Sequence, residues 1–257
     1  MLESLVRAFL YHPTVLAPGT PLPPYVRGAT EVWFEAAEGN RIHGLHWPAP
    51  AGRPTILFLH GNAQSVFEWA LISQELEPLK CGLLLIDYPG YGKSNGSPHE
   101  EGLYAAGRGA LAWLTNEAGV LERQVVVFGK SLGGGVATEI AQDREVLGVV
   151  LESTFRSVLH VARWLLPMLP VGAILRSERY ESIARVDRLR APVLVIHGTR
   201  DELIPPAEGQ ALYEAAPDPK ELYLVKGAGH NDVSWIAGSE YGDRLRRWLE
   251  ACVLAER

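Results

Sequence analysis

The stretch VVVFGKSLGGG, from Val125 to Gly135, decides how this chain is to be interpreted. A run of β-branched and aromatic residues ends at a glycine, a lysine and a serine, followed closely by three more glycines. Two kinds of chemistry use such a turn. A phosphate loop uses Gly-Lys-Ser to hold a nucleotide, whereas a strained turn of the form G-x-S-x-G presents a serine nucleophile.

The spacing of the glycines excludes the phosphate loop. That loop needs a glycine five positions before its Gly-Lys pair, so that backbone N–H groups can surround the phosphates. The required position holds Gln124 before Gly129, and Asp87 before the second Gly-Lys-Ser at 92–94. We therefore expect no nucleotide site, and we interpret the second copy as a structural turn.

The nucleophile turn fits without adjustment. Gly129-Lys130-Ser131-Leu132-Gly133 matches G-x-S-x-G, in which small residues on both sides of the serine let strand and helix approach closely. The pattern predicts a strand over 125–128 and a helix beginning near Leu132. An ordinary glycine-rich turn with an idle serine would look the same, so the partners of Ser131 decide between the two.

Composition places the chain among globular proteins, and its length is normal for a large α/β domain. It has 257 residues, of which 47% are hydrophobic and 21% charged, and its net charge is −6 with no basic stripe. Nucleic acid is therefore not an expected partner. Cys81 and Cys252 lie far apart and are expected to be buried free thiols in a reducing compartment, which favours a cytoplasmic location. No apolar run is long enough for stable membrane insertion.

The N-terminus is expected to form a small unit of its own. Residues 1–26 combine a helix, with apolar residues at helical spacing, and a proline-stiffened linker that leads into a main domain over 27–257. The stretch lacks the features of a signal peptide. We expect the helix to dock on the body, with a weak membrane-surface contact as the alternative.

Three further elements are expected downstream of this segment. A hairpin should turn at Gly39-Asn40, and a capping box at Ser65 should open a helix that runs to about Pro78. A closing helix should place the following residues on one face: Tyr241, Leu245, Trp248, Leu249 and Cys252.

Over the whole of this region, buried strands alternate with amphipathic helices. Such a pattern predicts a mostly parallel sheet covered on both faces, in which ligands bind beyond the carboxyl ends of the strands. Ser131, Asp201 and His230 each follow a predicted strand, and so does His60-Gly61-Asn62. These chemically active residues should therefore meet at one edge of the sheet.

Four short motifs resemble those of the α/β-hydrolase superfamily of serine hydrolases: HGNA, GKSLGG, HGTRDELIP and GAGHND. They occur in the family's order, and the resemblance extends from about Arg27 to the end. It implies an α/β-hydrolase fold, with a mostly parallel eight-stranded sheet, helices on both faces and a short helical cap insert over about 154–186. It also implies a Ser131–Asp201–His230 catalytic triad.

The roles follow from the chemistry of the hydroxyl group. A serine is a weak nucleophile, so His230 would accept its proton while Asp201 orients the imidazole. Glu152, which also follows a strand, is the alternative acid, and Asp232 is a further acidic neighbour. Lys130 is expected to be an exposed surface lysine.

An oxyanion hole requires two preorganised donors beside the serine. The backbone N–H of Leu132 would be one, and Asn62 the other, with Ala63 as the alternative. The insert contains many apolar residues, among which Trp164, Leu165 and Met168 are expected to bind substrate. Simple packing of the insert against the core is the competing interpretation.

Taken together, these features predict a serine hydrolase that acts on carboxylic esters or thioesters with a small to medium apolar acyl group. The reaction would pass through an acyl-enzyme, with no cofactor and no metal. An amidase or peptidase with the same triad is the first alternative, and a non-catalytic binding protein on the same scaffold is the second. The sequence does not define an oligomeric state.

Overall fold

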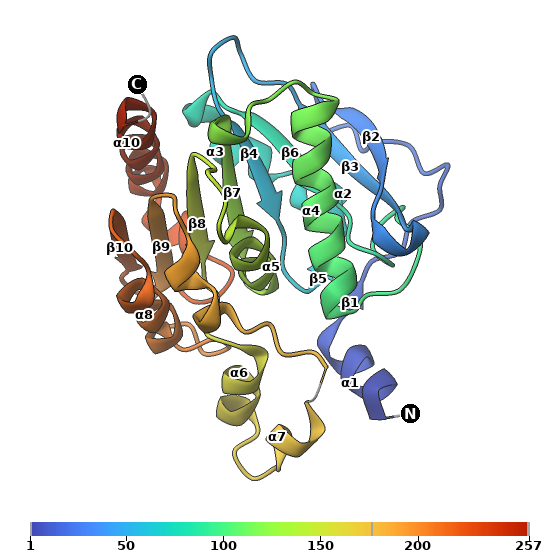
Figure 1. Cartoon of the computed structure of the whole chain (residues 1–257), viewed down its shortest axis with the longest axis vertical. Helices are drawn as coiled ribbons and strands as arrows, with labels where there is room; N and C mark the ends of the chain where they lie inside the picture. The colour runs from blue at the N-terminus through green and yellow to red at the C-terminus, as the bar shows by residue number, and fades with distance from the viewer. Residues whose placement is uncertain (1, 176, 256–257) are drawn as a thin grey trace.

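A computed structural model of the chain describes residues 2–175 and 177–255. Its centre is an eight-stranded sheet with the strand order β10-β9-β8-β7-β4-β6-β3-β2 (Figure 1). β3 is antiparallel to both of its neighbours, and the remaining pairs are parallel. The strands are β2 (Thr30–Glu35), β3 (Arg41–Trp47), β4 (Thr55–Leu59), β6 (Gly82–Ile86), β7 (Val125–Lys130), β8 (Gly148–Glu152), β9 (Val193–Gly198) and β10 (Lys220–Val225).

The central strands are buried along their whole length. Every residue of β4, β6, β7, β8 and β9 is buried, as expected for parallel strands that are covered on both faces. The predicted mostly parallel sheet of eight strands is therefore confirmed. The predicted hairpin is also present, because β2 and β3 pair antiparallel across a short 3₁₀ turn at Ala37–Gly39.

Helices cover the sheet in two layers. α4 (Glu100–Asn116), α5 (Leu132–Ala141) and α8 (Pro206–Ala215) contribute to one hydrophobic core. Figure 1 draws α4 and α5 in front of the sheet. The opposite core contains residues of α2 (Val66–Trp69), α3 (Ile72–Leu76), α9 (Val233–Ala237) and α10 (Ser239–Ala255). The predicted inward face of α10 is buried throughout: Tyr241, Leu245, Trp248, Leu249 and Cys252.

The helix expected to run from Ser65 to about Pro78 is broken. Its capping box is present, because the Ser65 side chain caps the first turn and Glu68 accepts the Ser65 N–H at 2.9 Å. The chain then tightens into i→i−3 bonds, and the Ser73 hydroxyl donates to the Ala70 carbonyl at 2.7 Å. This side chain competes for a carbonyl that a continuous α-helix would use, so α2 and α3 are separate.

The expected cap insert forms two short helices beyond the end of the sheet. They are α6 (Val158–Leu165) and α7 (Val171–Ile174), and the segment between them contains Pro167 and Pro170. Figure 1 places α1 (Leu2–Leu10) at the same end of the molecule as α6 and α7. After α1, strand β1 (His12–Pro13) pairs in parallel with β5 (Ala63–Gln64). No helix among the described residues is long and apolar enough to cross a membrane.

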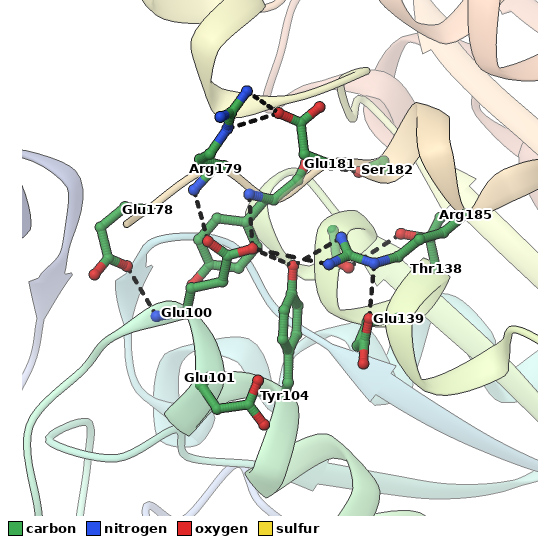
Figure 2. Close-up of polar contacts among 12 residues, drawn as sticks. Glu100, Glu101, Tyr104, Thr138, Glu139, Glu178, Arg179, Glu181, Ser182 and Arg185 are labelled. Carbon is green, nitrogen blue, oxygen red and sulfur yellow. Dashed lines mark hydrogen bonds and ion pairs between the residues drawn. The ribbon is translucent and has the colours of Figure 1, made fainter. Parts of the chain in front are cut away.

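A polar network fixes the returning arm of the insert to the first turn of α4 (Figure 2). The Glu100 carboxylate accepts the backbone N–H groups of Arg179 and Tyr180 at 2.6 and 2.9 Å. In the other direction, the buried Glu178 carboxylate accepts the N–H of Glu100 at 2.8 Å. It also accepts from Arg7, at 2.7 Å, and from the Tyr11 hydroxyl. A single buried carboxylate therefore joins α1, α4 and the insert.

Candidate active site

The turn at Ser131 is strained in the way that its sequence requires. Ser131 has φ 53° and ψ −119°, a backbone conformation that residues with a side chain rarely adopt. The glycines around it are needed for space. A Cβ on Gly129 would lie 2.4 Å from the Gly133 carbonyl oxygen, and one on Gly133 would lie 1.9 Å from that of Leu59. The turn thereby holds the serine hydroxyl at the carboxyl end of β7.

The structure brings the three predicted triad residues together. The Oγ of Ser131 lies 3.0 Å from Nε2 of His230, and Nδ1 of His230 lies 2.7 Å from Oδ2 of Asp201. The residues come from loops after β7, β10 and β9, which end at the same edge of the sheet. With Nδ1–H donating to the carboxylate, Nε2 is free to accept the serine proton.

Asp201 is held in its charged form. Burial alone would raise its pKa, but hydrogen bonds from His197 and His230 and the backbone N–H of Ile204 outweigh burial and lower the pKa below its usual range. The Leu203 and Ile204 N–H groups donate to Oδ1 at 3.0 and 2.8 Å. The carboxylate is therefore both fixed in orientation and kept ionised.

His197 is a neighbour of the site whose contact the sequence alone did not predict. It is fully buried, and its Nε2 lies 2.9 Å from the Ile204 carbonyl oxygen and 3.3 Å from Oδ2 of Asp201. Its Nδ1 has no hydrogen-bond partner among the described residues, so the proton is assigned to Nε2. The signal was available, because His197 stands four residues before Asp201 in the same strand-to-loop segment.

The alternative acids have other partners. Glu152 is buried, and its carboxylate accepts from Nζ of Lys130 and from the Tyr241 hydroxyl, each at 2.6 Å. Asp232 accepts the Gly229 N–H at 2.6 Å and so shapes the loop that carries His230. The expectation that Lys130 is an exposed lysine is wrong: it is 7% exposed, because a buried carboxylate on the neighbouring strand attracts its ammonium group.

The loop expected to supply the second oxyanion donor lies directly beside the serine. A Cβ on Gly61 would lie 3.5 Å from the Cβ of Ser131. The Asn62 side chain does not face the serine, because its Nδ2 donates to the Leu10 carbonyl at 3.0 Å. The carbonyl of Asn62 accepts the His12 N–H at 2.9 Å and the Tyr91 hydroxyl at 2.8 Å. These contacts leave the backbone N–H of Asn62, with that of Leu132 at the start of α5, as the candidate donors.

Comparison with known proteins decides the family. A sequence model described as the alpha/beta hydrolase family matches residues 56–187, and one described as serine aminopeptidase, S33, matches residues 177–233. An uncharacterized protein of Mycobacterium tuberculosis is 35% identical over 256 residues, covering 98% of this chain and 90% of that protein. The chain belongs to the alpha/beta hydrolase family.

Other members of the alpha/beta hydrolase family are similar over most of the chain. Mouse alpha/beta hydrolase domain-containing protein 17C is 34% identical over 224 residues, covering 86% of this chain and 68% of that protein. An esterase of Pyrococcus furiosus superposes with a TM-score of 0.75 at 20% identity, covering 94% of this chain and 97% of that one. An alpha-beta hydrolase of Vibrio vulnificus gives 0.73 at 21% identity, covering 88% and 83%. These structures show the shared fold.

The cleft of this hydrolase beside Ser131 differs from the one its sequence predicts. It has a volume of about 670 Å³, and its apolar wall includes Trp69, Leu71 and Ile72 of the α2–α3 segment. The three residues expected to bind substrate do not line it. Trp164 and Met168 are exposed, and Leu165 lines a separate apolar cavity against α1. The insert is anchored to α1 and α4, and its apolar side chains line the cavity against α1 instead.

Proposed function

We propose that this hydrolase cleaves a carboxylic ester or thioester with a small to medium apolar acyl group through an acyl-enzyme on Ser131. The observation that supports it is the pair of hydrogen bonds, 3.0 and 2.7 Å long, that link the Ser131 hydroxyl to His230 and His230 to Asp201. A serine becomes a nucleophile when a base can accept its proton and a carboxylate orients that base.

In the first half of the reaction, Oγ of Ser131 attacks the acyl carbon while Nε2 of His230 takes the hydroxyl proton. Collapse of the tetrahedral intermediate breaks the bond to the alkoxide or thiolate, which leaves with the proton from His230. In the second half, water attacks the acyl-enzyme and gives its proton to His230. The carboxylic acid then departs and the Ser131 hydroxyl is restored.

The transition state is stabilised from two sides in this mechanism. Backbone N–H groups of Leu132 and Asn62 would donate to the oxyanion, and loss of one such donor raises the barrier by about 3–4 kcal/mol. Asp201 stabilises the imidazolium that forms on His230, which its lowered pKa favours because the carboxylate stays ionised.

The cleft supports an apolar acyl group. Trp69, Leu71 and Ile72 form one wall, while Glu68 and Glu75 in the same lining disfavour anionic substrates. The match of residues 177–233 to a serine aminopeptidase model makes peptide bonds the second candidate substrate, because the same groups would perform that cleavage. We also propose a cytoplasmic location, which the two free thiols Cys81 and Cys252 support.

A fluorophosphonate probe followed by a substrate panel tests this proposal. We expect the probe to label the wild-type protein, and Ser131→Ala to abolish both labelling and hydrolysis of short-chain p-nitrophenyl esters. Ser94→Ala is the matched control, because Ser94 also follows Gly-Lys but its hydroxyl donates to the Asp87 carbonyl at 2.8 Å. No labelling of the wild type would favour the non-catalytic binding protein, and a preference for peptides over esters and thioesters would favour the peptidase.

A further inference from the structure

One face of the molecule exposes large apolar side chains from two segments that are far apart in sequence. In the insert, Trp164 is 59% exposed, Met168 92% and Leu169 52%, and on α1 Phe9 is 72% exposed. Such side chains are costly to expose together, and contiguous apolar patches on a soluble surface mark interaction sites. We call this surface, formed by α1, α6, the 166–170 loop and α7, the apolar face.

The space between the two segments is apolar as well. A cavity of about 280 Å³ lies between α1 and the insert, and no charged or polar side chain lines it. Its lining consists of Val6, Phe9, Leu10, Val158, Val161, Ala162, Leu165, Leu166, Leu169, Val171, Ile174 and Leu175. The apolar face is thus a groove with exposed edges, and it offers few hydrogen-bonding groups to a polar partner.

The charge of the insert is opposite to that of the molecule. Residues 154–186 contain five arginines and two glutamates, whereas the whole chain has a net charge of −6. One of the two glutamates, Glu178, is buried and is ion-paired with Arg7. Arg156 and Arg179 pair with Glu208 and Glu181. Arg163, exposed on α6, adds positive charge next to Trp164.

These features identify the occupant. We propose that the apolar face docks on the surface of a lipid bilayer that contains anionic phospholipids. Apolar side chains would enter the interfacial region while Arg163 on α6 meets phosphate groups, as in helices that lie in the membrane plane. A tryptophan at the edge suits this position, because its ring is amphipathic. Anionic lipid would repel the rest of this negatively charged protein, whereas the local positive charge lets it approach the apolar face.

The structure holds the apolar face in place as a platform. Glu178 connects α1 to the insert through Arg7 and Tyr11. It also connects both to the start of α4, because it accepts the N–H of Glu100 (Figure 2). The end of α1 and the strand after it also hold the Asn62 loop, because the Asn62 side chain donates to the Leu10 carbonyl and β1 pairs with β5. Docking would therefore bring a bilayer near the end of the sheet where Ser131 lies. The inference about docking does not rest on the proposed hydrolysis.

Co-sedimentation with vesicles tests the inference. We expect the wild-type protein to bind vesicles of phosphatidylcholine with phosphatidylglycerol more tightly than vesicles of phosphatidylcholine alone, and to lose that preference at high salt. Leu169→Asp should weaken binding at least about tenfold, because it removes an apolar contact and adds a like charge. Arg163→Ala should weaken binding about fivefold on anionic vesicles only.

The matched control is Leu254→Asp. Leu254 is 69% exposed near the end of α10, at the opposite end of the molecule from α6 and α7 (Figure 1), and its variant should bind vesicles as the wild type does. Met168→Asp provides a second test at the loop, and thermal unfolding verifies that each variant is folded. Absence of wild-type binding, or equal losses in the Leu169 and Leu254 variants, would overturn the proposal. So would self-association in solution that Leu169→Asp abolishes, since a second copy would then cover the face.

Discussion

Asp201 and Glu152 lie at the ends of neighbouring strands, but they have different hydrogen-bond partners and therefore different expected roles. Asp201 accepts from His230, at 2.7 Å, and Glu152 accepts from Lys130 and Tyr241. We expect Asp201→Asn to lower kcat by about 10³–10⁴-fold in a protein that still folds, because the imidazole loses its orienting acceptor. Steady-state kinetics on a short-chain ester measures kcat, and thermal unfolding verifies that the variant is folded.

Glu152→Gln should show the reverse pattern. Removing the carboxylate leaves the Lys130 ammonium group nearly buried without its charge partner, which destabilises a protein by about 3–5 kcal/mol. We expect a large decrease in the free energy of unfolding in urea, with kcat per folded molecule near that of the wild type. If Asp201→Asn retained most of the activity while Glu152→Gln abolished it in a folded protein, the assignment of the acid would be wrong.

The positions of individual site residues could be predicted from the sequence where a local motif determines them. Ser131, Asp201 and His230 each follow a strand in a recognisable turn, so their meeting could be expected from topology. Lys130 could not be placed in the same way, because its burial depends on a carboxylate 22 residues away on the next strand. The contact between His197 and Asp201 likewise depends on how the loop after β9 folds back.

The turn between β7 and α5 depends on glycine at defined positions. A Cβ on Gly133 would lie 1.9 Å from the Leu59 carbonyl oxygen. Because that oxygen belongs to the backbone of β4, it cannot move aside as the end of a flexible side chain could. We expect Gly133→Ala to displace α5 from β4, to lower the melting temperature by several degrees or more, and to reduce kcat by moving the Leu132 N–H.

Gly242→Ala is the matched control for this substitution. Gly242 lies in α10 with open space around the position of its Cβ, so alanine should leave activity unchanged and stabilise the helix by about 0.5–1 kcal/mol. Thermal unfolding of both variants, with ester hydrolysis of each, makes the comparison. Equal melting temperatures for the two variants would contradict the steric account of the turn.

Helices and strands with a strong hydrophobic period could be predicted from the sequence. Features that depend on particular hydrogen bonds or on pairing between distant residues could not. Continuous apolar runs gave the buried strands, and the 3.6-residue period gave the inner face of α10. The division of 65–78 into α2 and α3 arises from hydrogen bonds of the Ser73 side chain and backbone to Ala70, which no hydrophobic period reports. The pairing of β1 with β5, which holds the Asn62 loop, joins segments about fifty residues apart.

For the whole molecule, the resemblance of four motifs predicted the architecture but not the direction in which the insert faces. The sheet, its two helical layers and a short two-helix insert follow from the alternation of strands and helices. The orientation of the insert depends on Glu178, a buried carboxylate that accepts hydrogen bonds from α1, from Tyr11 directly after α1, and from the first residue of α4. Trp164 and Met168 are exposed and do not line the cleft beside the serine, although their apolar character alone suggested a ceiling over the site.

Two histidines in separate parts of the molecule couple its stability to pH. Burial lowers the pKa of His60 and of His46 below the usual 6.5, because the charged imidazolium would lose its hydration. The unfolded chain therefore binds these protons at a higher pH than the folded protein. Their contribution to stability is complete above pH 6.5 and declines as the pH falls below it, by up to about 1.4 kcal/mol per pH unit for each histidine.

The carboxylate of Asp201 affects stability only at lower pH, so the effect of the histidines on stability can be measured separately. The pKa of Asp201 is lowered from 3.8, so its stabilising contribution is present above that pH and is lost only as the pH falls towards the folded value. Urea unfolding at a series of pH values should thus show that the free energy of unfolding decreases as the pH is lowered from 7.5 to 5. The dependence of this free energy on pH should be weaker in His60→Gln. A free energy that stays flat or rises over this interval would mean that the protein accommodates charged imidazoles in its interior.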